Sequence, residues 1–343
     1  MRLRAACVAV MATGLLGQAA FAAEPAHVNV AISQTSSDVG IFVAIKRGYF
    51  RDAGLEVKTI PFDSAAKMVA PLGAGELDVG SGSLAAGVYN AVARGVKIEA
   101  VADSGSAPPG YGHNILLVRK DLIESGRWKV LQDFKGMTIA LTSPGASSNA
   151  TLNVALQQFG LKFADIEPVY LGYPEHVLAL VNRKVDAGLT AEPAATQAIG
   201  ANAAVRVTSD DVIDPYHQAA VILYSSVFAH DHPETATRFM TAYLRGVRDY
   251  NDGLKGGRIA GPAGEAIIAI LTEYTNIKDP AVYRAISPQG CNPEGHVNKL
   301  SLDKDLQFYR AQGWINGEIT LDQVVDDRFV AAALKELGPY RPK

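Results

Sequence analysis

The sequence of 343 residues has few cysteines, since Cys7 and Cys291 are the only two. Two cysteines permit one bridge at most, which excludes a framework of several disulfides. The sequence also lacks an excess of positive charge, because 32 Lys and Arg residues stand against 35 Asp and Glu residues. The resulting formal net charge of -3 gives no basic footprint for nucleic acid, so we expect no nucleic-acid partner.

Long apolar runs are missing after the first residues, so no later stretch of about 20 apolar residues predicts a membrane span. The first residues combine Met1-Arg-Leu-Arg4, an apolar run over 5–16 and the small-x-small pattern Ala20-Phe-Ala22. This combination is typical of a secretory signal peptide. We therefore expect residues 1–22 to be removed, with cleavage near Ala22 or Ala23, and the mature chain to reach the periplasm. Cys7 would be lost with this segment.

Common catalytic motifs are also missing: the sequence has no Gly-x-Ser-x-Gly, no phosphate loop, no His-Glu-x-x-His and no Cys-x-x-Cys. Cys291 lies in Pro288-Gln-Gly-Cys-Asn-Pro293, which predicts a turn-rich surface loop without a positioned base. His230 and His232 flank Asp231 before a predicted helix, a pattern more typical of a solvated cap than of a metal site. We expect no enzyme activity, no metal and no cofactor.

What the sequence does contain is a hydrophobic content of 48%, which suffices for a core in each of two domains. Segments with the period of strands alternate with segments with the period of helices, which predicts an α/β fold with mainly parallel sheets and flanking helices. The first series comprises strands 27–33, 55–60, 77–80 and 97–103 and helices 38–47, 64–74 and 83–94. The second comprises strands 137–142, 167–171 and 185–190 and helices 147–159 and 174–183.

Two apolar extended segments, 114–119 and 218–225, stand before and after the second series and predict buried strands that cross between two lobes as a hinge. We therefore expect lobe one to contain residues 23–113 and 219–343, and lobe two to contain residues 114–218. The tail from His232 onward is expected to be mainly helical and to wrap lobe one, with Pro233 in a first turn.

Two pairs of motifs carry a family resemblance. Residues 39–57 predict an apolar helix that ends at Gly48, a turn through Arg51-Asp-Ala-Gly54 and a new strand, and they are followed by Gly73-Ala-Gly-Glu-Leu-Asp-Val-Gly80. Downstream, Phe134-Lys-Gly-Met-Thr-Ile-Ala140 is followed by Asn182-Arg-Lys-Val-Asp-Ala-Gly-Leu-Thr-Ala-Glu-Pro193. These motifs resemble the periplasmic solute-binding proteins of the nitrate, sulfonate and taurine ABC-transporter family, which is related to binders of thiamine-pyrimidine precursors.

The resemblance implies a two-lobed periplasmic binding protein fold of type II with a two-strand hinge. It also implies a monomer that traps one small ligand by lobe closure and delivers it to the membrane permease of an ABC importer. In such open sheets the ligand lies beyond the carboxyl ends of the strands, where helix N-termini present free N–H groups. The same positions also favour ordinary capping residues. We expect the ligand to contact Ser36, Ser37, Asp38, Ser64, Ser81, Gly82, Ser83, Ser147, Ser148, Asn149, Glu192 and His217.

The class of ligand follows from the residues expected in the cleft. They include no Arg, so an anion would rely on N–H groups and hydroxyls rather than on a guanidinium clamp. Ala191 stands where the resemblance implies an aromatic residue before Glu192-Pro193, which favours an organic anion bulkier than taurine, such as an aromatic carboxylate or a sulfonate. Two alternatives stay open: a thiamine-pyrimidine-type precursor whose donors Asp38 and Glu192 would accept, and a periplasmic sensor subunit.

Overall fold

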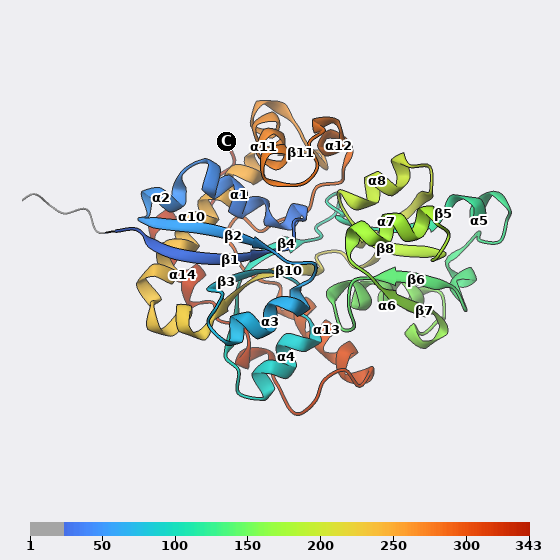
Figure 1. Cartoon of the computed structure of the whole chain (residues 1–343), viewed down its shortest axis with the longest axis horizontal. Coiled ribbons are helices and arrows are strands. Elements are labelled where there is room, and N and C mark those ends of the chain that lie inside the picture. Colours follow the sequence, from blue (N-terminus) through green and yellow to red (C-terminus); the bar gives the residue numbers. More distant parts are fainter. Residues whose placement is uncertain (1–23) are drawn as a thin grey trace, which may run out of the picture.

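Two five-stranded sheets organise residues 24–343, the part of the chain that the computed structural model describes (Figure 1). The predicted signal peptide and its cleavage site lie outside these described residues. The first sheet has the strand order β2-β1-β3-β10-β4, and the second has the order β7-β6-β8-β5-β9. We call the first sheet with its covering helices lobe one, and the second with its helices lobe two; they lie side by side in Figure 1. No helix among residues 24–343 combines the length and the apolar character needed to cross a membrane.

The first sheet is mostly parallel, because helices connect its successive strands as parallel pairing requires. Strand β1 (Ala26–Ile32) pairs in parallel with β2 (Leu55–Pro61) and with β3 (Val79–Gly82). Strand β10 (Gln218–Ser225) pairs antiparallel with β3 and with β4 (Ile98–Ser106). The strands β1 to β4 therefore share one direction, and their carboxyl ends lie at the same edge.

The second sheet repeats this arrangement. Strand β6 (Thr138–Leu141) pairs in parallel with β7 (Glu167–Tyr170) and with β8 (Ala187–Ala191). Strand β5 (Asn114–Arg119) pairs antiparallel with β8 and with β9 (Ala204–Ser209). The predicted α/β fold with mainly parallel sheets and flanking helices is thus confirmed.

The two strands expected to form the hinge are not themselves the connections between the lobes. Strand β5 lies inside the second sheet and β10 inside the first, each with a neighbour on both sides. Both are buried along their whole length, so their N–H and C=O groups need partners on both edges, which only a sheet provides. The chain passes between the lobes just before these strands, through residues 107–113 and 214–217.

Helices cover both faces of each sheet, and each face has its own apolar core. One face of lobe one packs against α1 (Val39–Lys46), α2 (Tyr49–Asp52), α10 (Pro233–Asp252), α11 (Gly261–Tyr274), α12 (Pro280–Ala285) and α14 (Arg328–Leu337). The other packs against α3 (Ala65–Gly73), α4 (Ala86–Ala93) and α13 (Lys299–Ala311). In lobe two, α5 (Lys120–Glu124), α6 (Ser147–Gln158) and α9 (Asp210–Ile213) cover one face, and α7 (Tyr173–Val181) and α8 (Ala194–Gly200) cover the other.

Short elements complete the described chain. They are the turns η1 (Ser36–Asp38), η2 (Leu131–Phe134), η3 (Phe163–Asp165), η4 (Val227–Asp231) and η5 (Leu321–Gln323), and the ribbon of β11 (Leu254–Lys255) and β12 (Arg258–Ile259).

The C-terminal tail is mainly helical, and α10 begins at Pro233 as predicted. It does not pack on lobe one alone, however. The ring of Phe308 in α13 meets Phe163 of lobe two with 5.6 Å between ring centroids, and Trp314 meets the same ring at 5.5 Å. Both contacts are edge to face, an arrangement that aromatic pairs prefer. The tail therefore ties the two lobes together.

The expectation of an exposed loop around Cys291 is wrong, because the side chain of Cys291 is only 7% exposed. Its Sγ lies 3.8 Å from the backbone oxygen of Asp103 and 3.9 Å from the hydroxyl of Tyr243, and Asn251 donates to its backbone oxygen at 3.0 Å. Burial raises the pKa of this thiol well above its ordinary value. The turn residues around Cys291 are held between β4 and α10 rather than in solvent.

Close packing of α1 on α10 yields a first prediction. A Cβ on Gly246 would lie 2.3 Å from the backbone oxygen of Gly40 and 2.9 Å from the nitrogen of Ala44, so the two helices approach through glycine. Gly246→Ala should lower the free energy of unfolding by about 1–3 kcal/mol, the usual result of overpacking.

Urea unfolding measures this loss, with Gly200→Ala as the matched control. Gly200 is also helical and has no atom within 4 Å of the added Cβ. That variant should be neutral or more stable by up to about 1 kcal/mol, because alanine is the better helix former. Equal stability of the two variants would contradict the packing argument.

Candidate ligand-binding cavity

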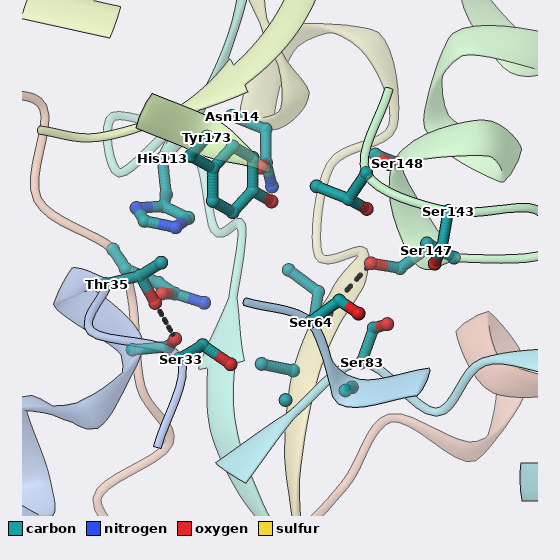
Figure 2. A pocket seen from close by; sticks show the side chains of 18 of the residues that line it. Ser33, Thr35, Ser64, Ser83, His113, Asn114, Ser143, Ser147, Ser148 and Tyr173 are labelled. Carbon is teal, nitrogen blue, oxygen red and sulfur yellow. Dashed lines mark hydrogen bonds between the residues drawn. The ribbon is translucent and has the colours of Figure 1, made fainter. Parts of the chain in front are cut away.

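A cavity lies between the two lobes, where the carboxyl ends of the parallel strands of both sheets face each other (Figure 2). Its wall is rich in hydroxyl groups that come from segments far apart in the sequence. The lining residues are Ser33, Thr35, Ser37, Asp63, Ser64, Ala65, Gly82, Ser83, His113, Asn114, Thr142, Ser143, Ala146, Ser147, Ser148, Tyr173, Ala219, Ala220 and Gln289.

Lobe one contributes the residues that directly follow β1, β2 and β3. Ser33 follows β1, and its hydroxyl donates to the backbone oxygen of Ser81 at 3.0 Å. Ser64 precedes α3, and its side chain makes no capping hydrogen bond. Gly82 ends β3, and a Cβ there would lie 2.7 Å from the Cβ of Ala65, so the wall fits only glycine without a shift. The strand ends thus bring small polar groups to one edge of the sheet.

Lobe two contributes the N-terminus of α6, which begins at Ser147 after Ala146. Ala146 has no side chain that can cap, so the first turn of this helix lacks an ordinary cap. The hydroxyl of Ser147 donates to the backbone oxygen of Ala219 at 2.9 Å. The hydroxyl of Ser148 is buried and has no hydrogen-bond partner among the described residues. Figure 2 shows Ser64, Ser147 and Ser148 facing the same space.

Four larger polar side chains complete the wall. Burial lowers the pKa of His113 to about 3, so its imidazole is neutral, and its Nδ1 lies 2.8 Å from Ser36 Oγ. Asn114 is held in place because its Nδ2 donates to Asp210 at 2.7 Å. Both amide atoms of Gln289 are buried without a partner among the described residues. Tyr173 extends from the start of α7 into the same space (Figure 2).

The cavity has little charge. Within residues 24–343, no Lys or Arg lines it, and Asp63 is the one carboxylate on its wall. Asp63 is exposed and pairs with the ammonium group of Lys67. The site therefore offers neutral donors and acceptors together with a helix N-terminus, which attracts negative charge.

The structure brings six of the predicted site residues to this wall: Ser37, Ser64, Gly82, Ser83, Ser147 and Ser148. The remaining six, Ser36, Asp38, Ser81, Asn149, Glu192 and His217, are buried but do not line the cavity.

Three of these six belong to lobe one. Ser36 directs its hydroxyl to Nδ1 of His113, and of these two residues only His113 lines the cavity. Asp38 caps its own turn, because its Oδ2 accepts from the backbone N–H of Thr35 at 3.2 Å; burial raises its pKa to about 7. Ser81 lies inside β3, before the strand end at Gly82, and is fully buried there.

The other three serve local structure instead. Asn149 Nδ2 donates to the backbone oxygens of Ser143 at 2.9 Å and of Ala146 at 3.2 Å, and so holds the loop before α6. Glu192 accepts from the backbone N–H of Thr196 at 2.9 Å and from its hydroxyl at 3.1 Å, which is the capping role, and burial raises its pKa.

His217 is engaged on the side away from the cavity. Its Nε2 lies 3.0 Å from Asp305 Oδ2, and its Nδ1 lies 3.3 Å from the hydroxyl of Thr151. Asp305 belongs to α13 and Thr151 to α6, so His217 joins the tail to lobe two. We expected His217 to face a ligand because it stands just before the segment that returns to lobe one. Its pairing with Asp305 of the tail fixes its orientation instead.

Sequence reasoning did not select Ser33, Thr35, Thr142, Tyr173 or Gln289. Ser33, Thr35 and Thr142 flank the predicted strand ends, so the same signal extended by one or two positions would have included them. His113 and Asn114, at the start of β5, also line the cavity. Gln289 comes from the tail, and no pattern in the sequence connects it to these strand ends.

The lobes touch each other beside the cavity. The backbone N–H of Ala86, in the first turn of α4, donates to the backbone oxygen of Gly145 at 2.9 Å. Gly145 has a φ of +68°, and a Cβ there would lie 2.4 Å from the Cβ of Ala86. On another side, Arg206 of lobe two donates to Ser287 Oγ of the tail at 2.9 Å. The lobes are therefore in direct contact with each other near the cavity.

Residues 36–252 match the family described as NMT1/THI5 like. Over 201 residues the chain is 30% identical to a protein of Escherichia coli strain K12 that is named as an aliphatic sulfonates-binding protein. That match covers 57% of this chain and 60% of the relative, so the chain matches less than two thirds of that relative's length.

Two solved structures share the fold. The periplasmic nitrate-binding protein NrtA from Synechocystis PCC 6803 has a TM-score of 0.75 at 11% identity, over 92% of this chain and 90% of that chain. The alkanesulfonate-binding protein SsuA from Xanthomonas axonopodis pv. citri, bound to MOPS, has a TM-score of 0.69 at 19% identity, over 89% of this chain and all of that chain (100%). At these identities the likeness establishes the fold, that of periplasmic binding proteins.

The pair of His217 and Asp305 predicts how stability depends on pH. Burial opposes the charge on His217 most strongly, but Asp305, Asp214 and Asp210 together outweigh it and raise the pKa of His217. Burial raises the pKa of Asp305 as well, which acts in the same direction. A group whose pKa is raised on folding stabilises the folded state. This contribution is complete at pH values below the pKa of the group in the unfolded chain, which is about 6.5 for His. It is lost as the pH rises through the pKa of the group in the folded protein.

We therefore expect the free energy of unfolding of the unmodified protein to fall, relative to that of His217→Gln, as pH rises from about 6 to about 9. The change is about 1.4 kcal/mol for each unit by which folding raises the pKa. Urea unfolding of both proteins across this range measures it. A difference between the two that stays constant with pH would contradict the assignment.

Proposed function

The chain belongs to the NMT1/THI5-like family and has the two-lobed fold of the nitrate, sulfonate and taurine class of solute-binding proteins, and from this premise we propose that it is the ligand-capturing component of an ABC importer. The observation that carries the proposal is the hydroxyl-lined cavity between the lobes, where Ser148 and Gln289 have buried polar atoms without partners. Buried polar groups are normally hydrogen-bonded, so a ligand that supplies the missing bonds would be held there.

The ligand we propose is a small organic anion with a carboxylate or sulfonate group. The free first turn of α6 favours a negative group by about 0.3–1 kcal/mol, and by up to about 2 kcal/mol when partly buried. The hydroxyl of Ser148 lies at that helix end. Since no cation lines the cavity in residues 24–343, hydrogen bonds rather than ion pairs would hold the anion.

A neutral precursor of the thiamine-pyrimidine type is the second candidate, and the free amide of Gln289 favours it because an amide can both donate and accept. Two carboxylates expected to accept from such a ligand do not support it, however. Neither Asp38 nor Glu192 lines the cavity: Asp38 accepts from a backbone N–H through Oδ2 and keeps only Oδ1 without a partner among the described residues, and Glu192 accepts from a backbone N–H. We therefore rank the organic anion first.

Binding rather than catalysis is consistent with the polar groups of the cavity. His113 is its one imidazole within the described residues, and Ser36, the hydroxyl beside it, does not line the cavity. Cys291 is buried elsewhere, with a raised pKa that disfavours the reactive thiolate. No arrangement of nucleophile and base on the wall supports an enzyme mechanism.

The proposed mechanism is closure of lobe two, residues 114–218, on lobe one, residues 23–113 and 219–343. The connections 107–113 and 214–217 are the places where such a motion would bend the chain. Only a ligand that contacts both lobes favours the closed state, and Ser64 and Ser148 offer one contact from each. A monomer exported to the periplasm would then present the closed form to the membrane permease. A sensor subunit would use the same closure, and deletion of the permease genes distinguishes the two roles.

Native mass spectrometry of the protein purified from its own host should identify one bound molecule per chain. With that molecule as the ligand, Ser148→Ala should weaken binding about tenfold or more, because a hydrogen bond to a charged group contributes about 1.5–3 kcal/mol. Isothermal titration calorimetry measures the change.

Ser104→Ala is the matched control, because Ser104 also carries a buried hydroxyl without a partner among the described residues, but it does not line the cavity. It should bind normally. Equal affinities for both variants and the unmodified protein would remove the cavity from the proposal, and a ligand-free protein in the mass spectrum would weaken the proposal as a whole.

The close contact of Gly145 with Ala86 gives a separate test of closure. Gly145→Ala adds a methyl group at a positive φ and pushes against Ala86, so the enclosed state should lose about 1–3 kcal/mol. The affinity for the identified ligand should fall by about fivefold or more as a result. Gly136→Ala also has a positive φ, but no atom lies within 4 Å of its Cβ, so it controls for backbone strain. Equal losses of affinity in both variants would argue against closure at this contact.

A further inference from the structure

The cavity with the partnerless hydroxyl of Ser148 is small. The space open to the centre of a water molecule is about 50 Å³. One water needs about 10–15 Å³ on this measure, so the cavity holds a group of a few heavy atoms and no ring with substituents. A compact polar group fits this inner chamber, and the rest of any larger organic ligand must lie outside it.

A second chamber adjoins the first and gives that remainder a place. It shares Ser33, Thr35, Asp63 and Tyr173 with the inner chamber, so the two chambers lie next to each other. Its space on the same measure is about 320 Å³. Side by side, the two chambers provide a narrow polar space and a wide outer space for the two ends of one ligand.

The wall of the outer chamber differs in character from the inner wall. Phe62, Pro174, Pro193 and Ile277 line it together with the ring of Tyr173. These side chains come from the segments after β2 and after α11 and from the starts of α7 and α8, so both lobes and the tail contribute. Phe62 and Ile277 are partly exposed, and covering them with an apolar group would remove them from water.

We propose that the outer chamber is a second subsite, which selects ligands by an apolar, ring-bearing tail, while the inner chamber holds the compact polar head. This inference rests on the proposed function and adds the class of ligand: an arylalkyl acid, with a short spacer between the acid group and the ring. Aromatic and proline surfaces line the outer chamber, and flat rings pack well on both. Polar residues such as Gln34 and Gln197 complete its wall together with the carboxylates of Asp63 and Glu175, so the acid group of the ligand is favoured in the inner chamber rather than here.

The test uses acetate, benzoate and 3-phenylpropanoate as probes of the exported protein, with 2-phenylethanesulfonate as the sulfonate form of the longest acid. Acetate contains the head alone, benzoate joins the ring directly to the head, and 3-phenylpropanoate provides the spacer. Calorimetry should show 3-phenylpropanoate or its sulfonate counterpart binding at least tenfold more tightly than acetate. Each buried methylene group raises the affinity about fourfold, and a buried ring raises it more. Benzoate should lie between them.

Two variants test whether the higher affinity of the ring-bearing probes comes from contacts in the outer chamber. Phe62→Ala and Ile277→Ala should each reduce the affinity for the longest probe about fivefold or more and leave the affinity for acetate unchanged. Phe159→Ala is the matched control: Phe159 is 37% exposed at the end of α6 and lines neither chamber, so this variant should bind all probes normally. Ser148→Ala should weaken every probe by a similar factor.

Equal affinities for acetate and the ring-bearing probes would overturn the second subsite while binding in the inner chamber stands. A failure of every probe, with a ligand still seen in the native mass spectrum, would overturn the arylalkyl acid and leave the proposed function intact. Losses for the longest probe that are the same in Phe159→Ala as in Phe62→Ala would also contradict the assignment.

Discussion

The direction of the strands is the constraint on which the rest of this structure depends. In each sheet, strands joined by helices run in parallel, so their carboxyl ends gather at one edge. One antiparallel strand, β10 in lobe one and β5 in lobe two, enters each sheet directly after the chain has passed from the other lobe. Short connections thereby bring the two polar edges together, and the cavity lies between them.

The electrostatic character of the cavity follows from its burial. A buried charge is energetically costly unless it is paired. The buried titratable groups on the wall and next to it avoid this cost because their pKa values are shifted toward the neutral form. The pKa of His113 is lowered to about 3, which makes the ring neutral, and the pKa of Asp38 is raised to about 7. On the wall itself, the buried polar atoms without a partner among the described residues belong to the hydroxyl of Ser148 and the amide of Gln289. A ligand therefore meets neutral donors and one helix N-terminus.

Helix α6 links this chemistry to the rest of the molecule. Its first residues, Ser147 and Ser148, line the cavity, and Thr151 one turn later contacts His217. His217 in turn is paired with Asp305 of α13, and the aromatic contact of Phe308 with Phe163 lies on the same helix of the tail. The tail thus supports the helix that carries the proposed anion site, besides covering the sheet of lobe one.

The sequence by itself determined the kinds of elements, their order and the segments that would carry the site. Alternating strand and helix periods predicted the two α/β series, and the motifs around Gly48 and Phe134 indicated the family that the comparison established. Strand ends pointed to Ser64, Ser83, Ser147 and Ser148 because parallel strands place such residues at a common edge.

Only the tertiary structure decided which side chains face the cavity. Ser81 lies inside β3 and is fully buried there, whereas Gly82 ends this strand and Ser83 follows it, and these two line the cavity. Partners distant in the sequence fixed the other side chains. The carboxylate of Asp305 holds His217, which does not line the cavity. The packing of the tail against β4 and α10 brings Gln289 to the wall and buries Cys291 two residues later in the chain. Periodicity records which face of an element is apolar, but it contains no information about which remote segment will pack there.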